Sequence, residues 1–333
     1  MLIFMKLSVV IPYYNADKWI GRMLESLLQQ DLPPEEYEII VVDDGSKNEP
    51  KVLKAYAARY TNIRYIRQEN SGPGGARNTG IKAAQGEYIF FCDSDDFIAE
   101  NVLGGLCEIA HSRKVDMLFH QIRRIPEGEK PKNPLRNFDH VNVYSSGKDF
   151  FALPFKDKIT TGVWQFIISR QFIESARLSF PSDMIMNEDS CFLIDAILAV
   201  GPVASVDVEV YFYVQNSQSL IHLTGRVEQR ERYVDNMMLF IRKLTSIIEN
   251  KEIVGNMPLD CLNNIKWVRN QKAFIMLFNA CHLPTDKFNR YMADLKSLHA
   301  YPKAFGRYKI LKWIYLIPFV IKFKNRMYNS KIQ

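Results

Sequence analysis

Apolar and polar positions alternate along this chain with more than one period. Short, mainly apolar runs, which are typical of buried strands, occur at 7–11, 37–42, 63–66 and 88–91. Between these runs, apolar residues recur at helical spacing, which predicts helices over 17–30, 52–60 and 76–84. Strands that alternate with helices in this way predict a parallel α/β sheet with right-handed crossovers.

Beyond residue 100 the pattern predicts further elements and then changes character. Helices are expected at 101–112 and 187–200, and strands at 116–123 and 206–214. The stretch 126–142 is polar and contains three prolines, so we expect a flexible excursion there. After about residue 225 the pattern becomes mainly helical, at 227–248, 261–281 and 295–324. We therefore predict an α/β domain over residues 1–225 and a helical C-terminal region over residues 226–333.

Composition narrows the class of protein. The 333 residues are 47% apolar with a formal net charge of +6, so a substantial core is expected and wholesale disorder is not. This mild charge does not require nucleic acid as a partner, and it is compatible with an anionic substrate or a membrane surface. The five cysteines form no CxxC pair, which favours reduced thiols in the cytoplasm. No apolar run is long enough to predict a transmembrane helix.

The C-terminal segment 307–326 has six basic residues around an apolar stretch and no acidic residue. That combination is typical of a segment in an anionic membrane interface, and Pro318 would kink it. The alternative is a terminal helix that packs on the domain with its basic side chains in solvent. We favour peripheral membrane contact, which places the protein in the cytoplasm on the inner face of the plasma membrane.

Acidic residues follow the ends of predicted strands at two places. Asp43 and Asp44 follow one strand, and Asp93, Asp95 and Asp96 follow another. Because the carboxyl ends of parallel strands share one rim of a sheet, we expect both turns in one ligand site. Crowded carboxylates favour a cation, and oxygen ligands suit Mg²⁺ or Mn²⁺. The alternative for the second turn is a solvated loop in which Asp96 caps the next helix.

Four motifs occur in a fixed order along the predicted α/β domain. They are SVVIPYYNA (8–16), VVDDGS (41–46), GPGGARNTGIKAAQGEYIFFCDSDD (72–96) and NEDS (187–190). Together they resemble family 2 glycosyltransferases with the GT-A fold, over residues 5–225. The resemblance implies a Rossmann-like domain that binds a nucleotide-sugar, and sugar transfer with inversion at the anomeric carbon.

The resemblance also implies roles for residues around the nucleotide. Pro12 and Tyr14 stand where the family lines the pocket for the base. Asp44 matches the residue that binds the uracil edge, with Asp43 as its support. Arg77 follows a predicted glycine-rich loop, 71–75, and stands where the family approaches the diphosphate. By itself, Arg77 is also an ordinary charge at the start of a helix.

The metal-binding and catalytic residues are implied in the same way. Asp93 and Asp95 match the family's metal motif, with Asp95 as the preferred ligand of Mn²⁺ or Mg²⁺, although the adjoining Asp96 leaves the register open by one position. Asp189 matches the catalytic base, and by itself it is also a carboxylate at a helix N-terminus. His222 matches a variable position after the last strand, where it could contact metal or diphosphate, and by itself a lone histidine is more often structural or simply exposed.

Two weaker matches leave alternatives open. Trp164 stands where the family often has an aromatic residue beside the acceptor, and a core position explains it equally well. The stretch QRERY at 229–233 resembles the QxxRW signature of processive polysaccharide synthases. Those synthases carry transmembrane helices beside the signature, and none is predicted here. We therefore treat this match as chance and expect transfer of a single sugar.

The expected function is transfer of a sugar from a nucleotide-diphosphate sugar, with a UDP-sugar as first choice. The expected acceptor is a hydroxyl of a glycan or lipid-linked molecule in bacterial cell-surface polysaccharide synthesis. An inactive relative that only binds nucleotide-sugars is the alternative, although Asp44, Asp95 and Asp189 together favour an enzyme. A sugar nucleotidyltransferase would carry a glycine-rich loop after the first strand, where this chain has PYYN at 12–15.

Overall fold

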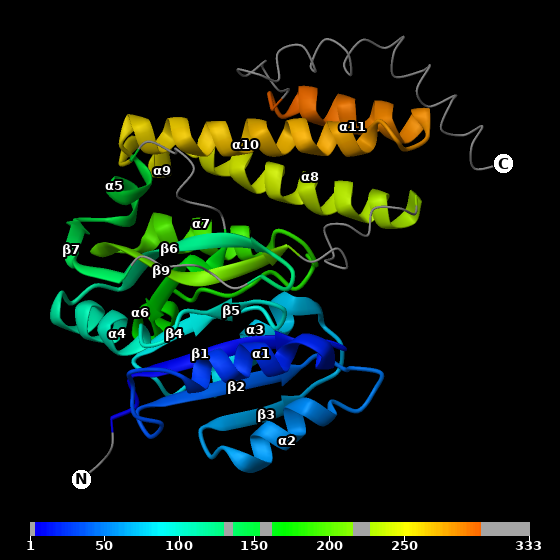
Figure 1. Ribbon diagram of the computed structural model, residues 1–333. Helices are drawn as coiled ribbons and strands as arrows, with labels where there is room; N and C mark the ends of the chain where they lie inside the picture. Colours follow the sequence, from blue (N-terminus) through cyan, green and yellow to red (C-terminus); the bar gives the residue numbers. More distant parts are fainter. Residues whose placement is uncertain (1–3, 130–135, 154–161, 216–226, 301–333) are drawn as a thin grey trace. The chain divides into compact units, whose positions relative to one another are not determined.

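The protein is described by a computed structural model that covers residues 4–129, 136–153, 162–215 and 227–300 (Figure 1). It divides into two compact units, residues 1–216 and 217–333. The first unit is an α/β domain and the second is helical. His222 and the basic segment 307–326 lie outside the described residues, so the predictions about them stay predictions.

Strands and helices alternate strictly in the first part of the α/β unit. The elements are β1 (Leu7–Tyr13), α1 (Asp17–Leu28), β2 (Tyr37–Asp43), α2 (Lys51–Arg59), β3 (Ile63–Arg67), α3 (Gly72–Ala83) and β4 (Tyr88–Phe91). They match the predicted elements in order and type. Apolar side chains on opposite faces of the strands explain the arrangement: Ile11 packs in one core cluster with Leu24 of α1, and Ile40 packs in another with Ala76 of α3. The sheet is therefore covered on both faces.

The remaining elements of this unit are shorter and more varied. They are β5 (Phe97–Ile98), α4 (Leu103–Ser112), β6 (Met117–Pro126), β7 (Arg136–Tyr144), α5 (Gly147–Phe151), the 3₁₀ helix η1 (Val163–Gln165), β8 (Phe166–Ser169), α6 (Arg170–Ser175), α7 (Glu188–Ala199) and β9 (Val203–Gln215). The strands form one nine-stranded sheet in the order β3-β2-β1-β4-β8-β6-β9-β5, with β7 paired to β9.

The prediction of a parallel sheet holds for only part of this order. Strands β3, β2, β1 and β4 are parallel, whereas β8 runs antiparallel to both β4 and β6. Strands β6 and β9 are parallel to each other, and β5 and β7 run antiparallel to β9. The sheet is therefore mixed. An apolar run reveals that a strand is buried but not its direction, so the pattern could not predict this reversal.

Two local predictions were wrong. Part of the expected excursion 126–142 belongs to β7, because the alternating residues after its prolines pair with β9. The expected loop 71–75 is largely the first turn of α3, which begins at Gly72. Gly72 has φ +78°, a conformation that favours glycine, and Pro73 follows in the first turn, where its missing N–H is tolerated.

The second unit consists of the helices α8 (Val227–Glu249), α9 (Lys251–Gly255), α10 (Leu259–Ala280) and α11 (Thr285–Ser297). The predicted helices 227–248 and 261–281 are thus confirmed. Ile241 of α8, Leu277 of α10 and Tyr291 of α11 share a buried apolar core. The stretch 229–233 lies in α8, where Glu231 forms an ion pair of 2.5 Å with Lys287. Within the described part of the chain, we find no helix with the length and apolar character that a membrane span requires.

Candidate active site at the carboxyl ends of the strands

Parallel pairing brings the two acidic turns to the same rim of the sheet. Strand β1 pairs with β2 on one side and β4 on the other, so the turns after β2 and β4 flank the end of β1. Tyr13 lies opposite Asp43 in this register, and the N–H of Asp44 donates to the carbonyl of Tyr13 at 2.8 Å. This arrangement confirms the expectation that both turns lie on one edge.

Asp43 is a buried support for its turn. Its Oδ1 accepts a hydrogen bond of 2.8 Å from the N–H of Ser46. Its Oδ2 accepts from the Tyr65 hydroxyl and from Arg67, both at 2.9 Å. Because both oxygens are engaged within the protein, Asp43 holds the end of β2 in place.

Asp44 is anchored on one side only. Its Oδ1 accepts hydrogen bonds of 2.8 Å from the Gln68 side chain and from the N–H of Ser71. Its Oδ2 has no hydrogen bond among the described residues, so it remains an acceptor that suits a ring N–H. Nearby in the chain, Pro12 lies inside β1 and Tyr14 directly follows that strand with 46% of its surface exposed. These placements are compatible with the predicted base pocket, which stays a prediction.

Asp96 faces the protein interior. Its Oδ2 accepts a hydrogen bond of 2.6 Å from the Tyr211 hydroxyl, and its Oδ1 accepts one of 2.7 Å from the N–H of Val214. Burial, with the nearby charges of Asp95 and Asp93, raises the pKa of the Asp96 carboxyl well above its ordinary value. Asp96 therefore fastens the acidic turn to β9, and its two engaged oxygens separate it from the candidate metal ligands.

Asp93 and Asp95 have different surroundings in this turn. Asp93 Oδ1 forms an ion pair of 2.7 Å with Arg77, while its Oδ2 has no hydrogen bond among the described residues. The N–H of Asp93 donates to the Tyr211 hydroxyl at 2.9 Å, and Arg22 of α1 donates to the backbone carbonyl of Asp95. The backbone of the turn is thus held from two sides.

The acidic turn fits a metal ion that takes most of its ligands from a substrate. No group of three or more His, Cys, Asp or Glu side chains within the described ranges is arranged to hold a metal ion. Mg²⁺ commonly binds through one or two carboxylates, and substrate phosphates and waters complete its shell. The open oxygen of Asp93 beside Asp95 matches that kind of site.

Arg77 lies at the centre of the carboxylates. It is 5% exposed; its Nη2 donates to Asp93 and its Nη1 donates to Glu188 Oε1 at 2.6 Å. Its guanidinium lies 5.4 Å from the centre of the Phe180 ring. Burial acts to lower the pKa of Arg77, but Asp93, Glu188 and Asp189 raise it above its ordinary value. The predicted approach of Arg77 to a diphosphate stays a prediction, since both Nη atoms here bind carboxylates.

Asp189 stands at the start of α7. Asn187 precedes the helix with φ +63°, and the next two residues, Glu188 and Asp189, form its acidic first turn. Glu188 is buried, while Asp189 is half-buried and its Oδ1 accepts from the N–H of Ser190 at 2.6 Å. The helix dipole favours carboxylates here, so Asp189 has the helix N-terminal position foreseen for it, and its catalytic role stays a prediction.

Two supporting residues had no signal in the sequence. Tyr211 links the acidic turn to β9, and Arg22 holds the carbonyl of Asp95 from α1. Neither stands in a motif, and their hydrogen bonds depend on tertiary structure. Trp164 is 8% exposed and stacks on Tyr211 with ring centres 5.2 Å apart, which favours its core role over contact with an acceptor.

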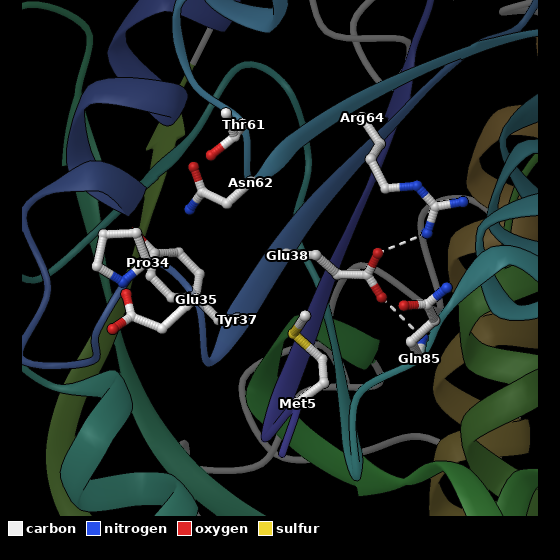
Figure 2. A pocket seen from close by; sticks show the side chains of 9 residues that line it. All are labelled: Met5, Pro34, Glu35, Tyr37, Glu38, Thr61, Asn62, Arg64 and Gln85. Atoms are coloured by element: carbon white, nitrogen blue, oxygen red, sulfur yellow. Dashed lines mark hydrogen bonds and ion pairs between the residues drawn. The ribbon is translucent and has the colours of Figure 1, made fainter. Parts of the chain in front are cut away.

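A pocket of about 340 Å³ lies at the amino ends of the strands of the same sheet, opposite the candidate site (Figure 2). Its lining includes Tyr37 and Glu38, at the start of β2, whereas the candidate site lies at the end of that strand. The Glu38 carboxylate accepts from Ser8, from Arg64 and from the N–H of Gln85 (Figure 2 shows the last two contacts). The pocket is therefore separate from the acidic turns, and its buried carboxylate joins neighbouring segments.

Comparison with known proteins identifies the family. The model of the family described as "Glycosyl transferase family 2" matches residues 8–174, half of the chain. The chain belongs to glycosyl transferase family 2. This match covers β1 to α6 and hence both acidic turns, and it bears out the resemblance seen in the sequence.

Curated relatives fall in the same group. The chain is 31% identical over 218 residues to the uncharacterized glycosyltransferase EpsJ of Bacillus subtilis, with 65% of this chain and 63% of EpsJ covered. It is also 31% identical over 215 residues to the poly(ribitol-phosphate) beta-glucosyltransferase of Bacillus spizizenii, with 63% and 32% covered. The chain thus spans less than two thirds of the length of either relative.

Solved structures show the shared fold. Residues 1–349 of Staphylococcus aureus TarS, in complex with UDP-GlcNAc, align with 90% of this chain and 82% of that one, at a TM-score of 0.63 and 21% identity. The GT-A fold predicted from the motifs is therefore confirmed, together with a helical C-terminal region.

Proposed function

We propose that this family 2 glycosyltransferase is inverting and metal-dependent, and that it uses a nucleotide-diphosphate sugar, with a UDP-sugar as the expected donor. The observation that carries the proposal is the group of Asp93, Asp189 and Glu188 around Arg77, on the same rim of the sheet as the half-anchored Asp44. Two relatives are poly(ribitol-phosphate) glycosyltransferases, which supports an acceptor hydroxyl on a cell-surface glycan or a lipid-linked molecule.

Different residues would bind the base and the diphosphate of the donor. Asp44 Oδ2 would accept a hydrogen bond from the base, and the exposed Tyr14 ring would lie against it. Asp95, with Asp93, would hold Mn²⁺ or Mg²⁺, which when bound neutralises the charge that develops on the departing diphosphate.

Asp189 would perform the proton transfer. As the acceptor oxygen bonds to the anomeric carbon, Asp189 takes its proton, and the bond from that carbon to the diphosphate oxygen breaks. A single displacement from the face opposite the leaving group inverts the configuration. One base suffices for this route, whereas retention through a covalent intermediate would need a separate nucleophile.

Nucleotide release tests the proposal directly. The protein with Mn²⁺ would be mixed with a panel of UDP-, GDP- and dTDP-sugars, and nucleotide formation would be followed together with the anomeric proton of the released sugar by NMR. We expect slow hydrolysis of a UDP-sugar, with the α-linked sugar released first as the β anomer. Release with retained configuration would contradict inversion. No release from any donor, with or without candidate acceptors, would contradict the enzymatic proposal.

A further inference from the structure

The first two turns of α3 contact both the acidic turn of Asp93 and Asp95 and the segment that precedes Asp189, the proposed catalytic base. Arg77 joins Asp93, at the end of β4, to Glu188, at the start of α7. These two carboxylates are far apart in the chain, and one buried guanidinium binds one oxygen of each. Because the Arg fork is planar and rigid, two such bonds fix the carboxylates relative to each other.

Asn78, the neighbour of Arg77, fixes the same segment through its backbone. Its Nδ2 donates to the carbonyl of Phe180 at 2.9 Å, and its Oδ1 accepts from the N–H of Phe180 at 2.8 Å. The Phe180 ring stacks on Phe192 of α7 with ring centres 4.2 Å apart, and Phe91 of β4 meets it edge-on at 5.2 Å. Through Phe180, the hydrogen bonds of Asn78 and this aromatic cluster thus connect α3, β4 and α7 next to Arg77.

Close backbone packing completes this junction. A Cβ placed on Gly74 would lie 3.1 Å from the carbonyl of Pro181 and 3.2 Å from Glu188 Cγ. The first turn of α3 therefore approaches the 180–188 segment so closely that a larger residue at position 74 would require its neighbours to shift. This contact leaves little room for the start of α7 to shift relative to the acidic turn.

We propose that Glu188 is a positioning residue, which acts through Arg77 to hold Asp93 in the orientation that leaves its Oδ2 for the metal. The inference rests on the proposed function. With Glu188 in place, one Nη atom of Arg77 serves each carboxylate. Without that charge, the freed Nη would draw both oxygens of Asp93 into a bidentate pair, a favourable geometry for Arg and carboxylate. Asp93 would then compete poorly as a metal ligand.

The chain supplies a matched control for this inference. Glu38 and Arg64, beside the pocket of Figure 2, also form an ion pair of 2.6 Å, and the Glu38 side chain is 3% exposed against 7% for Glu188. Both glutamates are buried, and each has an arginine partner. Only Glu188 shares its arginine with the acidic turn.

The experiment compares Glu188→Gln with Glu38→Gln. UDP would be titrated calorimetrically into each variant with Mn²⁺ and with EDTA, and thermal unfolding would be followed alongside. We expect both variants to unfold at lower temperature than the wild type. Glu188→Gln should weaken the Mn²⁺-dependent binding of UDP about tenfold, the scale on which residues that orient metal ligands act. Its UDP binding in EDTA should match that of the wild type, and Glu38→Gln should match the wild type in both conditions.

Each outcome has a defined meaning. Equal Mn²⁺-dependent binding in Glu188→Gln and the wild type would overturn the positioning role, while metal-dependent binding by the wild type would keep the proposed function intact. If Glu188→Gln does not fold, Arg77→Lys replaces it, because one ammonium keeps the charge but cannot span both carboxylates; unchanged metal dependence there would equally overturn the inference. Absence of nucleotide binding by the wild type would overturn the proposed function and this inference together.

Discussion

Two buried glutamates, at opposite ends of the strands of one sheet, each pair with an arginine and serve different purposes. Glu38 pairs with Arg64, whose side chain is 40% exposed and also donates to the carbonyl of Ala83. Glu188 pairs with Arg77, whose side chain is 6% exposed and also donates to the carboxylate of Asp93. The second partner makes the difference, because a carbonyl completes a structural bridge whereas a second carboxylate brings excess negative charge to the site.

The two ends of the strands also differ in which kind of polar atom is left without a hydrogen bond. At the amino ends of the strands, Glu38 is surrounded by donors from Ser8, Arg64 and Gln85. At the carboxyl ends, Asp44 and Asp93 each keep one oxygen without a hydrogen bond among the described residues. The amino ends have an open atom too, the buried Nδ2 of Asn62 in the pocket of Figure 2, which is a donor. The open atoms at the carboxyl ends are carboxylate oxygens, which suit a cation or the N–H of a base.

The largest expected effect distinguishes loss of sugar transfer from loss of nucleotide binding at the carboxyl ends of the strands. Replacing Asp189 with Asn removes the proposed base and should lower the rate of sugar transfer by about 10²–10⁴-fold, while UDP binding is unchanged. The matched control is Asp183→Asn, because Asp183 is an exposed aspartate in the same segment. Steady-state rates with the donor found active give the measurement. A rate for Asp189→Asn equal to that of Asp183→Asn would exclude Asp189 as the base.

A smaller effect compares the hydrogen bonds that hold the acidic turn with those that hold Glu38 at the amino ends of the strands. Tyr211→Phe removes a hydroxyl that bonds both Asp96 and the N–H of Asp93, so it should cost about 1–3 kcal/mol of unfolding free energy. Ser8→Ala removes a hydroxyl that donates to Glu38 and should also destabilise the fold. Denaturant titration measures both losses.

Nucleotide binding then distinguishes the two scaffold variants. Tyr211→Phe should also weaken Mn²⁺-dependent UDP binding, because it loosens the backbone of the turn that carries the candidate metal ligands. Ser8→Ala should leave that binding unchanged. Equal effects of the two variants on UDP binding would contradict the view that the carboxyl ends of the strands bind the ligand while the amino ends have a structural role.

A further effect concerns the buried His120 of β6 and depends on pH. Burial lowers the pKa of His120 to about 4, below its ordinary value of 6.5. Protonation therefore favours the unfolded chain, so the stability that neutral His120 provides is complete above pH 6.5 and is lost as the pH falls towards 4. The loss should approach about 3 kcal/mol.

His120→Asn should remove this pH dependence. Because Asp96 titrates in the opposite sense, its raised pKa favouring the folded state at low pH, the quantity to follow is the difference between wild type and variant. That difference in unfolding free energy should shrink between pH 6.5 and pH 4. The exposed His111 provides the control variant His111→Gln, and a constant difference for His120→Asn over this window would contradict a buried neutral imidazole.

Sequence patterns predicted the elements better than their directions. The buried strand 88–91 was placed correctly because its apolar run is uninterrupted, and the parallel pairing around β1 followed from helices between strands. The reversed direction of β8 was not predictable, since burial is the same in either direction. The first turn of α3 was mistaken for a loop, because Gly74 is there for close packing and not for flexibility.

The candidate site was predictable where motifs mark it. Asp44 and Asp93 stand in turns at strand ends, so rim geometry alone brought them together. Asp96 shows the limit of this reasoning, because adjacent acidic residues look alike in sequence and only burial against Tyr211 separates it from the others. The bridge from Arg77 to Glu188 joins distant segments, and no local pattern could have indicated it.

Calorimetric titration of UDP into the protein, first with Mn²⁺ and then with EDTA, tests most directly whether the carboxyl edge is a metal-assisted nucleotide site. We expect binding that EDTA weakens strongly and that Asp95→Ala reduces by about a hundredfold or more in Mn²⁺, with Asp183→Ala unchanged. UDP binding that is equally tight in Mn²⁺ and EDTA, or that Asp95→Ala leaves intact, would contradict it.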